Sequence, residues 1–210
     1  MEAEPVTATF FDPHQRATIE AAMARMIPTD DQPGAREAGT IEFLDRYLSG
    51  LGFIYAKPDG SGFETLEGKR AEAWQGRIEI LRVKYREGVA ELDQRSRVEF
   101  GSEFKTLAPE QQDGILTAVE QAAASGLSGP ALQQTSTETE LDFVPLLAMH
   151  TRQGFYADPI YGGNRDRIGW QVIGFPGPDS LNEVFTGRYS TLAWFAEGHQ
   201  DANSEDSHGR

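Results

Sequence analysis

The four histidines are the residues best suited to hold a metal ion or move a proton near neutral pH, and they are widely separated. His14, His150, His199 and His208 include no pair at the i, i+4 spacing of a helical metal site. We therefore expect surface or hydrogen-bonded core roles for His14 and His150, and no functional role for the two tail histidines. The chain has no cysteine, which excludes disulfides, iron–sulfur ligation and thiol nucleophiles.

Motifs that place a nucleophile or a phosphate are also missing: there is no G-x-S-x-G, no P-loop and no strand-linked G-x-G-x-x-G. Gly162-Gly163-Asn164 lacks the flanking strand and helix of a phosphate cradle, so we predict a sharp turn there. Carboxylates cluster at Asp30-Asp31 and at Glu138, Glu140 and Asp142, but acid–base catalysis needs a shared cleft, which spacing alone does not establish. A calcium loop of the D-x-D-x-D-G type is absent. The sequence thus predicts no catalytic, cofactor-binding or metal-binding residue.

Composition narrows the class of protein further. The chain has 210 residues, 39% of them apolar, and a formal net charge of -14. Such acidity disfavours binding to nucleic acid or to an anionic bilayer, because both would repel it. No apolar run approaches the roughly 20 residues of a membrane span, and the first residues carry no export signal.

Apolar residues at helical spacing predict a mainly α protein with five principal helices. Asp12 can cap the first helix, Pro13 suits its first position, and Pro28 ends it. The others are predicted at about 37–49, 66–98, 106–124 and 138–151. Gly88 marks a potential break, and Pro145 predicts a kink or a late start of the last helix. The stripe from Trp74 to Tyr85 is more typical of core packing than of a quinone or haem contact.

The C-terminal third differs from the rest in composition, because aromatic residues alternate with glycine and proline after Gln153. Such a sequence favours an irregular segment whose rings pack against another surface. We expect one helical subunit domain over residues 1–197, with a partner-docking segment at 155–178, and an acidic, disordered tail at 198–210.

Three segments resemble the gluconate 2-dehydrogenase subunit 3 family. The most specific is residues 155–170, which read FYADPIYGGNRDRIGW and continue at 173–178 as IGFPGP. Residues 10–14 (FFDPH), with the helix that closes on MIPTD at 26–30, and residues 38–45 (AGTIEFLD) are similar to the same family. The likeness covers roughly residues 10–178.

The resemblance implies a complex rather than a self-sufficient enzyme. In such complexes a large FAD-dependent flavoprotein of the glucose–methanol–choline (GMC) type oxidises the sugar, and a cytochrome c subunit often takes the electrons. The small subunit carries no cofactor and is thought to assist the folding of the flavoprotein and its twin-arginine export to the periplasm. This sequence shows no twin-arginine leader, so either it is mature protein, or this member is exported by another route or stays inside. Periplasmic placement, with membrane association through partners, is the expectation.

The predicted partner interface consists of Phe155, Tyr156, Asp158, Tyr161, Asn164, Arg165, Trp170 and Phe175. The charged residues Asp158, Arg165, Asp166 and Arg167 are expected to fix the turn among themselves. The alternative is that the segment folds back over its own helices, and both descriptions can hold for different residues. Two rival functions stay open, a stand-alone carboxylate-based hydrolase and a transient folding chaperone. The substrate of the complex also stays open among gluconate, glucose, other polyols and glycosides.

Overall fold

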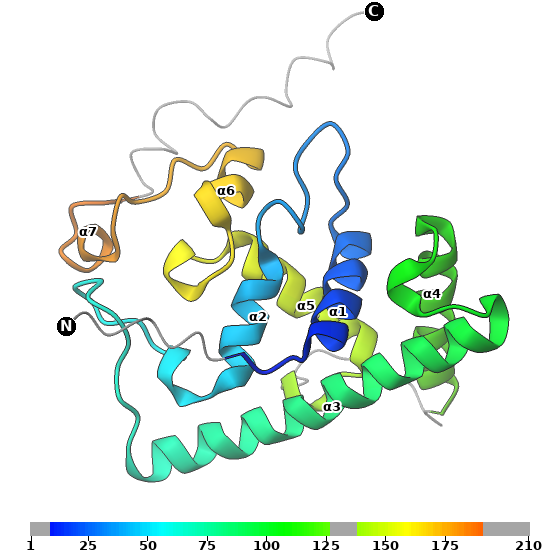
Figure 1. Cartoon of the computed structure of the whole chain (residues 1–210). Coiled ribbons are helices and arrows are strands. Elements are labelled where there is room, and N and C mark those ends of the chain that lie inside the picture. Colours follow the sequence, from blue (N-terminus) through cyan, green and yellow to red (C-terminus); the bar gives the residue numbers. More distant parts are fainter. Residues whose placement is uncertain (1–8, 127–137, 191–210) are drawn as a thin grey trace, which may run out of the picture.

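The computed structural model of the chain describes residues 9–126 and 138–190 (Figure 1). The α-helices are α1 (Pro13–Met26), α2 (Thr40–Ser49), α3 (Gly68–Phe100), α4 (Pro109–Gly126), α5 (Phe143–Tyr156), α6 (Ile168–Val172) and α7 (Leu181–Phe185). Short 3-10 turns, labelled η, are η1 (Leu51–Phe53), η2 (Phe104–Thr106), η3 (Glu138–Glu140), η4 (Pro159–Tyr161) and η5 (Arg165–Arg167). Within the described ranges β pairing is limited to one isolated bridge between Ala56 and Phe63. The mainly helical prediction is confirmed.

The start of α1 follows from its first residues. Asp12 accepts a hydrogen bond from the amide of Gln15 at 2.8 Å, and the Gln15 side chain accepts one from the amide of Asp12 at 3.2 Å. This reciprocal pair satisfies two amides that a helix end leaves open, and Pro13 has no amide hydrogen to satisfy. The predicted beginning of the helix is therefore confirmed.

The longest element, α3, is one unbroken helix of 33 residues. The break expected at Gly88 was wrong, because this glycine serves packing and not flexibility. A Cβ at Gly88 would lie 2.2 Å from Cδ2 of Phe143, so the ring of Phe143 occupies the space that a side chain would need. In Figure 1, the long helix α3 extends along one side of the molecule.

The core forms where α1, α2, α4 and α5 pack together against α3. Residues 78, 81 and 85 of the predicted stripe on α3 are fully buried, whereas Trp74 is half-buried at its edge. The central residues of this core are Ile19, Met23, Leu44, Leu48, Leu81, Tyr85, Leu92, Phe104, Ile115 and Leu146. A smaller cluster of Ile54, Leu66 and Ile78 lies beside it.

The late start predicted from Pro145 is also confirmed, because α5 begins at Phe143 and places Pro145 in its first turn. The helix continues to Tyr156, five residues beyond the expected end, so the first residues of the aromatic segment are helical. After it the chain turns through η4, η5 and α6. None of the described helices is long and apolar enough to cross a membrane. The tail predicted at 198–210 lies outside the described residues.

Candidate functional site

The segment 155–178 is held against the helices of its own chain by three of its predicted interface residues. Phe155, Asn164 and Trp170 are all buried. The side-chain amide of Asn164 donates to the carbonyl of Ala157 at 2.8 Å, and its oxygen accepts from the amide of Gly169 at 2.8 Å. The indole N–H of Trp170 donates to the backbone carbonyl of residue 156 at 2.8 Å. These three side chains fix the backbone of the segment and do not offer a free surface.

Two glycines of this segment permit very close contacts between backbones. A Cβ at Gly163 would lie 2.1 Å from the carbonyl oxygen of Gly154, and one at Gly169 would lie 1.9 Å from that of Phe155. The predicted sharp turn at residues 162–164 is confirmed, since Gly162 has φ 105° and Asn164 has φ 48°. The turn lets the chain double back onto α5.

The charged residues of the segment bind groups other than one another. Asp158 accepts from the amide of Ile160 at 2.9 Å, and Arg167 pairs with Asp179 at 3.3 Å. Arg165 lies over Gly39, and its amide donates to the carbonyl of residue 38 at 2.8 Å. The expectation that the charged residues fix the turn among themselves was therefore wrong, and the uncharged Asn164 does so instead.

The remaining predicted interface residues differ in their exposure. Phe175 is half-buried and packs edge-on against Trp170 with ring centroids 5.4 Å apart. Tyr161 is half-buried, and its hydroxyl accepts from the amide of Ala56 at 3.2 Å. Tyr156 is 41% exposed. Thus the segment has an inward side, which holds it in place, and an outward side.

Tyr156 and Tyr161 face a depression that we call the aromatic hollow, with a volume of about 450 Å³. It lies between the end of α5, helix α2, the turn η1 and the beginning of α3. Its walls are formed by Phe43, Tyr47, Phe53, Ile54, Trp74, Arg77, Glu138, Gln153, Tyr156, Ala157 and Tyr161. Two aromatic residues of segment 155–178 thus line a hollow together with four rings from other parts of the chain.

A buried carboxylate, Glu138, lies at the floor of the hollow and has three side-chain partners. One of its oxygens contacts Nε2 of His150; the other accepts from the Tyr47 hydroxyl at 3.0 Å and from Nε of Arg77 at 2.5 Å. The Tyr85 hydroxyl lies 2.7 Å from Nδ1 of His150. The Tyr85 hydroxyl and the Glu138 carboxylate thus occupy both ring nitrogens of His150.

The electrostatics of this network keep Glu138 ionised. Burial acts to raise its pKa, but the hydrogen bond and charge of His150 and the Arg77 guanidinium lower the pKa overall. Burial and the nearby carboxylate raise the pKa of Tyr85 and of Tyr47, so both phenols stay protonated. The polar side chains at the floor of the hollow therefore hold one another in place, and each has a partner within this network.

The sequence contained only part of the signal for this network. Glu138 was noted within a carboxylate cluster, and a surface or hydrogen-bonded core role was expected for His150. Arg77 and Tyr85 are eight residues apart on α3, and so share a face, but nothing local indicates that η3 and α5 meet them there. The convergence is a property of the tertiary fold.

Comparison with protein families assigns this chain to one of them. The family model described as Gluconate 2-dehydrogenase subunit 3 matches residues 13–177. The chain belongs to this family. No curated protein and no solved structure matches the chain significantly. The family is that of an accessory subunit of a dehydrogenase complex.

In this subunit 3 chain, the three hallmark segments meet at α2. The carboxylate of Asp45 accepts hydrogen bonds from the amides of Phe10 and Phe11 at 2.7 and 3.0 Å. At the other end of α2, a Cβ at Gly154 would lie 2.9 Å from Cγ2 of Thr40, which shows how closely α5 approaches. The hallmark residues of the subunit 3 family therefore build one continuous structural unit.

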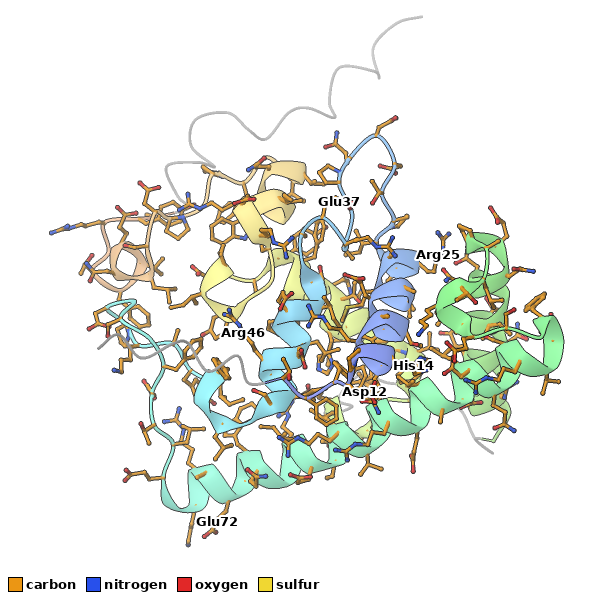
Figure 2. The ribbon with its side chains drawn as sticks, in the orientation of Figure 1. Asp12, His14, Arg25, Glu37, Arg46 and Glu72 are labelled. Atoms are coloured by element: carbon orange, nitrogen blue, oxygen red, sulfur yellow. The ribbon has the colours of Figure 1, made fainter. Side chains whose placement is uncertain are left out.

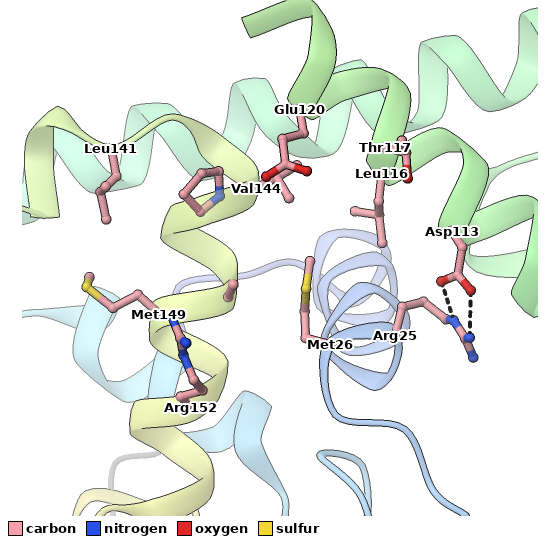
Figure 3. Close-up of a pocket in the computed structure, with 12 residues that line it drawn as sticks. Arg25, Met26, Asp113, Leu116, Thr117, Glu120, Leu141, Val144, Met149 and Arg152 are labelled. Carbon is pink, nitrogen blue, oxygen red and sulfur yellow. Dashed lines mark hydrogen bonds and ion pairs between the residues drawn. The ribbon is translucent and has the colours of Figure 1, made fainter. Parts of the chain in front are cut away.

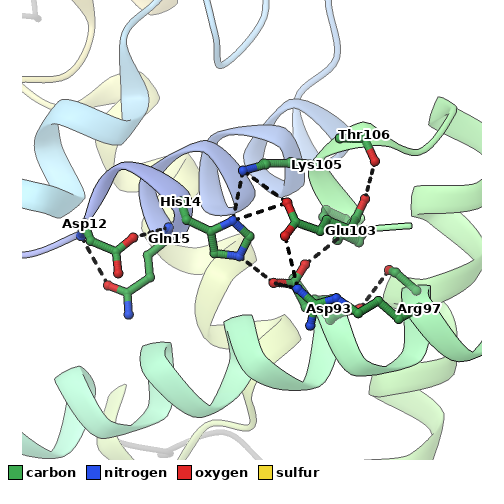
Figure 4. A network of polar contacts seen from close by, with 11 residues as sticks. Asp12, His14, Gln15, Asp93, Arg97, Glu103, Lys105 and Thr106 are labelled. Atoms are coloured by element: carbon green, nitrogen blue, oxygen red, sulfur yellow. Dashed lines mark hydrogen bonds and ion pairs between the residues drawn. The ribbon is translucent and has the colours of Figure 1, made fainter. Parts of the chain in front are cut away.

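A second polar cluster of this subunit 3 chain is structural in character (Figure 4). His14 lies 2.5 Å from a carboxylate oxygen of Asp93 and 2.9 Å from Nζ of Lys105. The other oxygen of Asp93 accepts from the amide of Phe104 at 3.1 Å. These contacts join α1 to α3 and η2. Both His14 and His150 thus have the hydrogen-bonded roles that were predicted for them.

Other grooves on this subunit 3 chain contain acids without a catalytic environment. One lies between α1, α4 and α5, and there Asp113 is bound by Arg25 through two hydrogen bonds of 2.8 Å (Figure 3). Another, between α3 and α4, is lined by Glu87 and Glu99, which are exposed, and by Glu91, which pairs with Arg95. The hydrogen bonds from Arg25 lower the pKa of Asp113, so this carboxylate is a paired anion. Within the described ranges no three His, Asp or Glu residues are placed to hold a metal ion.

Proposed function

We propose that this chain is the non-catalytic small subunit of an FAD-dependent dehydrogenase of the GMC type. The flavoprotein partner would oxidise a sugar, polyol or glycoside and pass electrons to a cytochrome c. The observation that carries the proposal is the family match over residues 13–177, which includes all of the hallmark segment except its last residue. FAD would belong to the partner.

The distribution of exposed apolar side chains supports a partner at the C-terminal third. Within the described ranges seven large apolar residues are exposed, and four of them lie beyond residue 155. These four are Tyr156, Ile173, Val184 and Phe185, the last 62% exposed. Exposed apolar side chains that are concentrated in one stretch of the chain are candidates for a protein contact.

We further propose that the chain assists the folding of the flavoprotein and accompanies it to the periplasm, where the complex contacts the membrane through its partners. A subunit that binds only the folded flavoprotein shifts the folding equilibrium toward that state. The buried contacts of Phe155, Asn164 and Trp170 support such a role, because they preorganise the outward side of segment 155–178, which then loses little conformational entropy on binding.

The test is a comparison of the chain alone with the chain produced beside its flavoprotein. We expect the isolated chain to show no flavin absorbance and no dehydrogenase activity. Produced with its flavoprotein partner, the chain should purify as a one-to-one complex that contains the flavin. Bound flavin in the isolated chain would contradict the proposal, and a flavoprotein that matures and then releases the chain would indicate a transient chaperone.

A further inference from the structure

We propose that the aromatic hollow receives an apolar side chain of the flavoprotein, and that a carboxylate beside this side chain pairs with Arg46. This inference rests on the proposed function, because it names what the partner inserts. It adds the chemistry of the contact, which the family match does not provide.

The walls of the hollow are rings held in fixed positions. Phe43 and Tyr47 are stacked with centroids 5.9 Å apart and planes 11° apart. Tyr47 meets Trp74 edge-on at 6.4 Å, and Trp74 meets Tyr55 edge-on at 5.8 Å. The Tyr47 hydroxyl is tied to Glu138. Preformed aromatic walls of this kind suit the burial of one apolar group.

The floor of the hollow favours an apolar occupant over a cation. Both oxygens of Glu138 are already bound, one by His150 and the other by Tyr47 and Arg77. An entering lysine or arginine would find no free carboxylate, and it would meet the guanidinium of Arg77 4.9 Å from the centroid of Trp74. An apolar side chain meets neither obstacle.

One cation, Arg46, lies beside the hollow although the chain as a whole carries a net charge of -14. The guanidinium of Arg46 lies 6.0 Å from the centroid of Phe53, beside the turn η4 (Figure 2). Over the described part of the chain, no carboxylate lies within ion-pair distance of Arg46, whose only hydrogen bond is a long one of 3.5 Å to the carbonyl of Ile160. A partner carboxylate would therefore find a cation that is not already paired.

Two polar groups at the rim can bind the backbone of an entering segment. Among the described residues neither the indole N–H of Trp74 nor the hydroxyl of Tyr156 has a hydrogen-bond partner, and Tyr156 is 41% exposed. Tyrosine, tryptophan and arginine are also the residues that most often dominate binding energy at interfaces. A second copy of this chain is a less suitable occupant, because two molecules of charge -14 repel each other.

The first test compares variants of the hollow in their binding to the purified flavoprotein. Tyr156→Ala and Arg46→Glu should each weaken binding at least tenfold, as expected for central interface residues. Val98→Ala and Arg95→Glu are matched controls at the other end of α3, where Val98 is 83% exposed, and both should bind like the wild type. Thermal melting of each variant verifies that it is folded.

The outcomes separate this inference from the proposed function. If the wild-type chain binds the flavoprotein and the folded hollow variants bind equally well, the inference is overturned and the proposed function stands. If the wild-type chain does not bind the flavoprotein at all, the proposed function fails and the inference fails with it. Weakened binding by the control variants as well would also contradict a contact centred on the hollow.

A second test identifies the occupant and does not require a weakened variant. A photo-crosslinking phenylalanine derivative is placed at position 156, the complex with the flavoprotein is irradiated, and the crosslinked peptide is sequenced. We expect a flavoprotein peptide with an apolar residue next to Asp or Glu. A crosslink to a second copy of this chain, to a peptide without a carboxylate, or to no peptide of the bound flavoprotein would overturn the inference.

Discussion

At the scale of single residues, two buried polar side chains determine the local structure around the hollow. The side chain of Asn164 holds the turn with two hydrogen bonds, one donated to the carbonyl of Ala157 and one accepted from the amide of Gly169. Glu138 joins η3 to α2, α3 and α5 through Tyr47, Arg77 and His150. In each case one side chain connects segments that are distant in sequence, so its substitution should destabilise all the segments that it joins.

Substitution of Asn164 separates the two reasons for its presence. Asn164→Gly removes both hydrogen bonds but tolerates φ 48°, and we expect a loss of about 1–3 kcal/mol of unfolding free energy. Asn164→Ala removes the same bonds and adds a left-handed backbone penalty of about 1 kcal/mol. Urea denaturation of the three proteins measures both values. Equal stability of the two variants would show that the backbone conformation carries no penalty.

Substitution of Glu138 should change how stability depends on pH. Because its pKa is lowered in the folded protein, the ionised carboxylate stabilises the fold above its unfolded pKa of about 4.3, and this contribution is lost as the pH falls through the folded pKa. Glu138→Gln should therefore lower stability at pH 7, by about 1–3 kcal/mol, and lessen the decline in acid. Urea denaturation across pH 3–7 tests this, with the exposed Glu72→Gln as control (Figure 2). An unchanged acid profile in Glu138→Gln would refute the role.

At the scale of elements, glycines decide how closely the helices and the hallmark segment approach one another. Gly88 lets the ring of Phe143 lie directly on α3, whereas Gly76 in the same helix has no atom near the position of a Cβ. The same residue type therefore has opposite consequences at two positions of one helix.

Substitution by alanine at these two positions of α3 provides a matched pair. Gly76→Ala should stabilise the protein by about 0.5–1 kcal/mol, because alanine is the better helix former. Gly88→Ala forces the Phe143 ring to move and should destabilise it by about 1–3 kcal/mol. Thermal melting monitored by circular dichroism compares the two. Stabilisation by both substitutions would contradict the packing described for Phe143.

Elements were more predictable from the sequence than their contacts. Asp12, Pro13 and Pro145 indicate helix starts through local chemistry, so these boundaries followed from a few neighbouring residues. Gly88 appeared to be a break because its reason, the Phe143 ring, is 55 positions away in sequence. The alternation of inward and outward residues in 155–178 was likewise hidden, because an irregular segment has no period from which burial can be read.

At the scale of the whole molecule, the net charge of -14 opposes the compact state through self-repulsion. Added salt screens this repulsion. We expect the melting temperature at pH 7 to rise by a few degrees between low and moderate sodium chloride. The same salt series at pH 5 is the comparison, because this pH is nearer the sequence pI of about 4.7. A fall in melting temperature with salt at pH 7 would mean that attractive ion pairs outweigh the repulsion.

We propose an accessory subunit whose C-terminal third is covered by a flavoprotein in the complex. Hydrogen–deuterium exchange of the chain, free and in complex with that flavoprotein, tests this most directly. We predict slower exchange in the complex at residues 51–57 and 155–178, which surround the hollow. A stable complex that protects other surfaces and leaves both segments unchanged would contradict the account.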